Sequence, residues 1–185
     1  MLIDHIYEAA VIPERWNDVL AKLARVAGAK DAVLIAARGA TFSRWLTSSP
    51  DFDEVVEAHS QRYPENLRTS RLVAAQYAGF LQDRDVMSQE EIDREPVYCD
   101  YLIPKGYGSG VATAIFSPSG DNIIIHAEYN HTRGSERPEI LAELDQLRPH
   151  FARAALLSSR LGLERARAMT EALGMLGLPC AVLRG

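Results

Sequence analysis

The feature that most limits the fold is a regular apolar pattern in residues 136–176. Apolar or small side chains recur there in alternating steps of four and three residues, which places them along one side of a helix. The positions are Ile140, Leu144, Leu147, Phe151, Ala154, Ser158 and Leu161, continued in frame by Arg165, Ala168, Ala172 and Met175. We predict one long helix, with a kink or restart at Pro149 because proline removes a helical hydrogen bond. Its first half, to about Phe151, is expected to cover the sheet of the same domain.

The remaining sequence contains two pairs of strand-like segments separated by blocks of helix. The first pair is 31–37 and 41–47, and the second is 110–116 and 122–129, joined by a loop with proline and glycine. Helices are expected at 2–11, from Pro13 to about 27, at 51–63, at 67–77 and from Ser88 to near Gly106, with 80–86 irregular or an edge strand. Because helices come in blocks between strand pairs, the sequence predicts an α+β fold with a mainly antiparallel sheet.

Three short signals mark the ends of these helices. Gly28 follows an amphipathic run and suits the left-handed position that stops a helix. Ser49 precedes proline and aspartate, which is typical of a helix start. Ser88 and Glu91 have the spacing of a capping box, in which each side chain bonds the other residue's backbone N–H.

Composition restricts the class of protein. The 185 residues suit one domain with an extension, and the net charge of −5 disfavours direct contact with phosphate backbones. Cys99 and Cys180 are too few for a disulfide framework. The N-terminus lacks the basic region of a signal peptide, and no apolar run reaches the roughly 20 residues of a membrane span, so we expect a cytoplasmic protein.

Catalytic and metal motifs are weak in this sequence. Gly108-Ser109-Gly110 precedes a strand, so it fails as a nucleophile elbow and as a phosphate loop. His126, Glu128 and Asn130 share one face of a strand, but two good ligands without a third favour a satisfied histidine over a metal site. Cys99 reads as a buried, inert thiol. We therefore expect no enzyme activity, no metal and no cofactor.

Aromatic and polar side chains on the segments covering the sheet are the candidates for a small-molecule pocket. Tyrosine joins a large apolar body to a hydrogen-bonding tip, which suits a small organic ligand in a mostly apolar cavity. The candidates at this stage are Trp45, His59, Tyr63, Tyr98 and Tyr101. For any one of them ordinary core packing is the favoured explanation, by roughly two to one, but in the group we expect at least one residue that lines a pocket.

Four stretches resemble bacterial LuxR-type helix-turn-helix regulators that have a GAF/PAS-like N-terminal sensor. They are Ile12–Leu23 (IPERWNDVLAKL), Val97–Gly106 (VYCDYLIPKG), Leu147–Leu156 (LRPHFARAAL) and Ala172–Leu183 (ALGMLGLPCAVL), in the family's order. The resemblance implies a GAF/PAS-like sensor at 1–135, a connector and dimerisation helix at 136–177, and at 178–185 the first residues of a PAS-like segment that is cut short. It also implies a DNA-binding domain beyond residue 185.

The resemblance adds one residue to the candidate pocket. Members that bind acyl-homoserine lactones carry an aspartate after a tyrosine, and Asn66 stands nearest to that position here. Asparagine still accepts a hydrogen bond but lacks the charge-assisted strength of a carboxylate.

Three functions remain open at the level of sequence. The first is a ligand-responsive sensor, with the ligand between the sheet and the helices of 51–77. The second is a ligand-free dimerisation module. The third is a small GAF-like enzyme, which is disfavoured because the sequence offers no recognisable set of catalytic residues.

For a homodimer, the expected contact residues are Ala154, Ser158, Leu161, Ala168 and Ala172.

Overall fold

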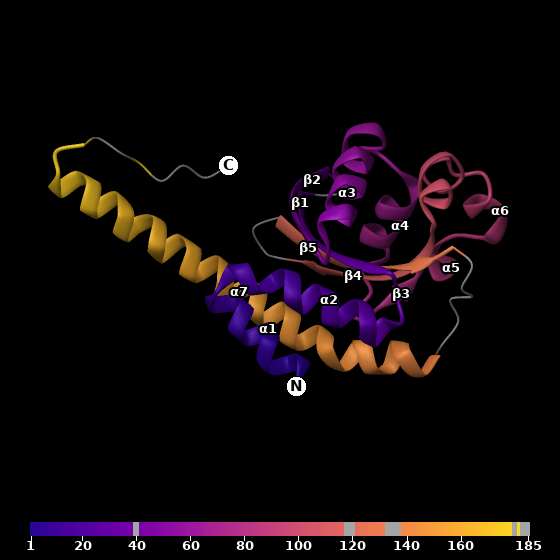
Figure 1. Cartoon of the computed structure of the whole chain (residues 1–185), viewed down its shortest axis with the longest axis horizontal. Coiled ribbons are helices and arrows are strands. Elements are labelled where there is room, and N and C mark those ends of the chain that lie inside the picture. The colour runs from indigo at the N-terminus through magenta and orange to yellow at the C-terminus, as the bar shows by residue number, and fades with distance from the viewer. Residues whose placement is uncertain (39–40, 117–120, 132–137, 179–180, 182–185) are drawn as a thin grey trace.

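The computed structural model describes residues 1–38, 41–116, 121–131, 138–178 and 181. A five-stranded antiparallel sheet lies between two layers of helices, in the order β2-β1-β5-β4-β3 (Figure 1). The strands are β1 (Asp31–Arg38), β2 (Thr41–Thr47), β3 (Leu81–Gln82), β4 (Tyr107–Phe116) and β5 (Asp121–Asn130). The predicted α+β class and both strand pairs are confirmed. The turn at 39–40, the hairpin loop at 117–120, the domain boundary at 135–136 and most of the segment 178–185 lie outside the described residues.

One face of the sheet is covered by the helices at the two ends of the chain (Figure 1). They are α1 (Leu2–Val11), a 3-10 turn (Pro13–Arg15), α2 (Trp16–Ala27) and α7 (Pro138–Met175). Leu144, Phe151 and Ala154 of α7 pack with α1 and α2 and with β-strand residues that include Val111 and Ile125. We call this the first core. Gly28 ends α2 at φ 65°, as predicted.

The other face carries the middle of the chain. Here lie α3 (Pro50–Arg62), α4 (Leu67–Ala75), α5 (Asp83–Val86), α6 (Gln89–Ile92), a π-helix (Val97–Leu102) and a 3-10 turn (Ile103–Lys105). These segments form the second core with sheet residues such as Ile35, Ala112 and Ile124. The Ser49 cap and the Ser88–Glu91 capping box are confirmed.

Several predicted boundaries are wrong. The helix expected at 67–77 ends at Ala75 because Gln76 adopts a left-handed conformation, with φ 47°. The segment 80–86 does contain an edge strand, but the strand has only two residues, and α5 follows it. The helical stretch expected from Ser88 to near Gly106 is present and ends there, divided into three short helices of different type. Finally, α7 runs through Pro149 as one helix, without the predicted restart.

The long helix α7 has two different halves (Figure 1). Its N-terminal half is anchored to the sheet, since Arg148 donates from Nε to Thr113 Oγ1 at 2.9 Å and from Nη2 to the Ala114 carbonyl at 3.0 Å. Its C-terminal half projects away from the sheet and leaves apolar side chains in solvent, among them Met169, Leu173 and Met175. None of the described helices is long and apolar enough to cross a membrane.

Candidate ligand-binding site

A cavity of about 60 Å³ lies between α3, α4 and the sheet, on the second-core side. Apolar side chains form most of its wall, and a group of charged side chains closes one end. Its lining includes Val33, Ile35, Phe42, Phe52, Val55, Val56, His59, Leu72, Leu102, Ala112 and Ile124, with Arg68, Thr69, Asp83, His126 and Glu128 among the polar members. One liquid water occupies about 30 Å³, so the closed cavity holds only a very small molecule.

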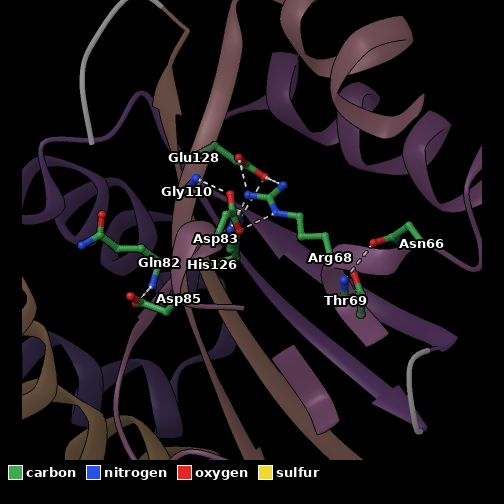
Figure 2. A network of polar contacts seen from close by, with 9 residues as sticks. All are labelled: Asn66, Arg68, Thr69, Gln82, Asp83, Asp85, Gly110, His126 and Glu128. Atoms are coloured by element: carbon green, nitrogen blue, oxygen red, sulfur yellow. Dashed lines mark hydrogen bonds and ion pairs between the residues drawn. The ribbon is translucent and has the colours of Figure 1, made fainter. Parts of the chain in front are cut away.

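Arg68 is the centre of the charged end (Figure 2). Its guanidinium forms a two-point pair with Glu128, Nη1 to Oε1 at 2.6 Å and Nη2 to Oε2 at 2.9 Å. Nε donates to Asp83 Oδ1 at 3.0 Å, and Nη2 lies 2.6 Å from His126 Nε2. The guanidinium carbon also lies 5.2 Å from the centre of the Tyr98 ring. All four polar residues are buried, so their mutual contacts replace water.

Local structure brings these residues together from four elements. Asn66 caps α4 by accepting from the Thr69 N–H at 2.8 Å, which fixes Arg68 in the first turn of the helix. On β5 the side chains of 126 and 128 point to the α4 side because strand residues alternate between faces. Asp83 begins α5, directly after the edge strand.

Gly110 completes the site from β4. Its N–H donates to Asp83 Oδ2 at 2.7 Å. A Cβ at this position would lie 2.5 Å from His126 Cε1 and 2.6 Å from the Ala127 carbonyl oxygen. Only glycine therefore lets the His126 ring lie flat against β4 while the backbone N–H reaches Asp83.

The contacts of His126 indicate which ring nitrogen carries a proton. Nδ1 lies 2.9 Å from Glu128 Oε1, where a ring proton satisfies the carboxylate. Nε2 faces the Arg68 guanidinium, which can only donate. A neutral imidazole with its proton on Nδ1 satisfies both neighbours, whereas a proton on Nε2 would point at another N–H.

Electrostatics keep the central pair ionised. Burial alone would raise the pKa of Glu128, but the charge of Arg68 and the hydrogen bonds from His126 and Arg68 outweigh burial and hold the pKa of Glu128 well below its usual range. Burial likewise opposes the charge of Arg68, and Asp83 and Glu128 raise its pKa well above the ordinary value. Burial also raises the pKa of Tyr98, and the neighbouring carboxylates of Asp83 and Glu128 act in the same direction.

The structure places the predicted pocket residues in different surroundings. His59 lines the cavity. Trp45 lies on β2 and donates to Asp53 Oδ1 at 3.0 Å, outside the lining. Asn66 is occupied as the α4 cap, and Tyr101 donates to the Val55 carbonyl at 2.8 Å.

The two remaining tyrosines also lie outside the lining. The Tyr63 ring packs between His59 and Tyr101 at centroid distances of 6.2 and 5.8 Å. Tyr98 lies beneath Arg68 without lining the cavity. The aromatic candidates thus mainly support the cavity wall, and only His59 forms part of it.

Sequence reasoning missed Arg68 and Asp83. One signal for Arg68 was available, because Arg68 and Leu72 are four residues apart and therefore on the same buried side of α4. A charged side chain on a helix face that packs against the core is stable only beside a buried group of opposite charge, so Arg68 predicts such a partner. In the part of the chain that the structure describes, no group of three or more His, Cys, Asp or Glu side chains is arranged to hold a metal.

His59 makes folding stability depend on pH. Burial, and then the charge of Arg68, lower the pKa of His59 from 6.5 to about 4. The unfolded chain therefore binds a proton that the folded protein excludes, and stability falls as the pH drops from 6.5 to 4. The loss is at most about 3 kcal/mol, reduced because the ring is only half-buried.

We expect His59→Gln to flatten this part of the pH profile. The test is urea unfolding at a series of pH values between 7.5 and 4. Ser60→Ala, on the next residue of α3, should keep the wild-type slope. An unchanged slope in His59→Gln would assign the pH dependence to other groups.

The layers and the cavity define the class of fold, which is that of LuxR-type ligand-binding domains. The chain superposes on the VqsR LBD domain from Pseudomonas aeruginosa with a TM-score of 0.64 and 14% identity, covering 86% of this chain and 94% of that one. It superposes on Escherichia coli SdiA with a TM-score of 0.56 and 15% identity, covering 90% of this chain and 77% of that one. No protein-family model and no curated protein sequence matches the chain. At these identities the likeness establishes the fold alone.

Proposed function

We propose that this chain is the small-molecule-responsive sensor domain of a bacterial LuxR-type transcriptional regulator, and not an enzyme. It signals through α7 to a DNA-binding domain outside this chain, and any contact with DNA is made by that domain. The observation that carries the proposal is a cavity with a buried charged end, in a fold shared with ligand-binding domains. The proposal includes no cofactor.

Strand β4 offers a direct route from the cavity to α7. Ala112 lines the cavity, and its neighbour Val111 points to the opposite face, into the first core with α7. Thr113 accepts the hydrogen bond from Arg148 of α7. A ligand that binds more tightly when β4 is shifted therefore also favours a shifted position of α7. The only requirement is that the two conformations of the domain differ in their affinity for the ligand.

Thermal melting with a panel of small metabolites tests ligand binding. A ligand that binds only the folded state stabilises it by RT ln(1 + L/Kd), where L is the free ligand concentration, so Tm rises with ligand concentration. Ala112→Val fills part of the cavity and should reduce the shift produced by any ligand found. Ala114→Val, on the same strand and equally buried but outside the lining, is the matched control. No shift with any compound would contradict the sensor proposal.

A ligand-free dimerisation module is the second candidate. It is favoured by the small volume of the cavity and by the apolar side chains exposed on the projecting half of α7. Both candidates include a homodimer formed through Ser158, Leu161, Ala168 and Ala172. Ala154 is withdrawn from this set because its side chain is wholly buried in the first core and has no surface left for a partner.

Charge substitution on α7 tests the dimer. We expect Leu161→Glu to shift sedimentation toward the monomer, because a carboxylate cannot be buried unpaired in an apolar contact. Ser159→Glu, two residues away and about 160° around the helix, should leave the dimer intact. Leu147 does not serve for this test because it belongs to the first core. A wild-type chain that sediments as a monomer would contradict the proposed contact.

A further inference from the structure

We propose that the cavity takes a small organic amine, bound as its ammonium ion with the charged head against Asp83 and Glu128. This inference rests on the proposed sensor function and specifies the ligand class of the same site. Three observations support it: the net charge of the polar end, the number of hydrogen-bond donors and acceptors still available there, and the volume and apolar lining of the cavity.

The polar end carries an uncompensated negative charge. Two carboxylates, Asp83 and Glu128, face one guanidinium, and the contacts of His126 are those of a neutral ring. Both oxygens of Asp83 accept N–H groups, one from Arg68 and one from Gly110, which is the pattern of an ionised carboxylate. The charges of Arg68, Asp83 and Glu128, together with a neutral His126, sum to one negative charge. A second cation would balance the cluster, and an anion would add to its imbalance.

The N–H donors of Arg68 and His126 are nearly all in use. A guanidinium has five N–H groups, and those of Arg68 make four contacts, one with Asp83, two with Glu128 and one with His126. The ring proton of His126 is held by Glu128. One Nη1 hydrogen of Arg68 is left, which is too little to hold a ligand carboxylate in two-point fashion.

Acceptor sites, in contrast, are still free. An ionised carboxylate accepts about four hydrogen bonds. Glu128 accepts three, from Nη1 and Nη2 of Arg68 and from His126, and Asp83 accepts two. Counting the contacts among the described residues, about one site on Glu128 and at least one on Asp83 therefore remain for donors. An ammonium group has up to three N–H donors for these acceptor sites, and its positive charge is opposite to the net charge of the cluster.

The rest of the cavity limits the size and polarity of the part of the ligand that is attached to the ammonium group. Val55, Leu72, Ala112 and Ile124 supply an apolar wall next to the charged end. A volume of about 60 Å³ restricts the body to a few carbon atoms while Phe42 and His59 hold their places in the wall. A short alkyl chain on an ammonium group meets both conditions.

Three probes of the same length and different head groups test this class at pH 7. We expect n-propylammonium to bind at least tenfold more tightly than n-propanol or propionate, measured by chemical-shift titration. Shifts should localise to the Arg68 Nε–H, the Gly110 N–H and the His126 ring. Propanol or propionate binding as tightly as the ammonium ion would overturn the inference, as would the absence of any binding.

Two further measurements separate this inference from the sensor proposal. Xenon enters apolar cavities without a head group, so xenon shifts combined with ammonium ions that do not bind would reject the ligand class and keep the cavity. Asp83→Asn and Glu128→Gln each remove one negative charge, and we expect either to reduce the preference for ammonium over propanol at least fivefold. An unchanged preference in a folded variant would also overturn the inference. Glu57→Gln, on the exposed side of α3, is the control that should retain it.

Discussion

Replacing Arg68 with methionine lowers the free energy of unfolding by about 3 to 5 kcal/mol, the cost of removing one partner from a buried ion pair. Methionine keeps most of the side-chain length but leaves Asp83 and Glu128 facing each other without a cation. Their charges then repel at a site where both side chains are buried and little screened by solvent. Urea unfolding followed by circular dichroism measures the loss as a shift in midpoint.

Arg71→Met is the matched control for this experiment. Arg71 lies one turn further along α4 and also pairs with a carboxylate, Glu91, at two points. Its pair is more than one-third exposed, so we expect a cost of about 1 kcal/mol or less. Equal losses in the two variants would show that burial does not set the strength of the Arg68 pairs.

A double variant separates the loss of the arginine from the exposure of its partners. Adding Glu128→Gln to Arg68→Met removes the carboxylate that had made two hydrogen bonds to the guanidinium. We expect part of the stability to return, because an uncharged amide costs far less to bury than an unpaired carboxylate. Losses that simply add would indicate that the two residues do not interact in the folded protein.

The fold was largely predictable because its signals are local. The heptad-like spacing of α7, the glycine that stops α2 and the Ser88–Glu91 capping box each depend on residues a few positions apart. The errors fall where tertiary packing decides. The sequence predicted a helical stretch from Ser88 to near Gly106 but not its division, in which a π-helix at Val97–Leu102 buries Tyr98 and Tyr101 in the second core.

The site was less predictable because its partners are distant in sequence. His126 and Glu128 were correctly placed on one strand face, since alternation is a local rule. Their partner Arg68 is about sixty positions away and meets them only after α4 docks on the sheet. The sequence offered aromatic side chains instead, and most of these pack behind the cavity wall.

The two halves of α7 should differ sharply in what they contribute to stability. Phe151 is 1% exposed and packs against Trp16 of α2 with ring centroids 6.4 Å apart. We expect Phe151→Ala to cost about 3 to 5 kcal/mol, the loss of a large buried side chain plus the cavity it leaves. Leu173→Ala, in the projecting half where the side chain is 37% exposed, should change stability by about 0.5 kcal/mol or less in the monomer.

Urea unfolding of both variants, at a concentration low enough to dissociate any dimer, measures this difference directly. Amide hydrogen exchange provides a second readout, because residues 140–155 should exchange only on global unfolding while residues 165–175 exchange by local fraying. A small cost for Phe151→Ala would mean that α7 is not docked on the sheet in solution. The route from Ala112 through β4 to α7 would then have no mechanical basis, since a signal can reach the projecting half only through a helix that is held to the sheet.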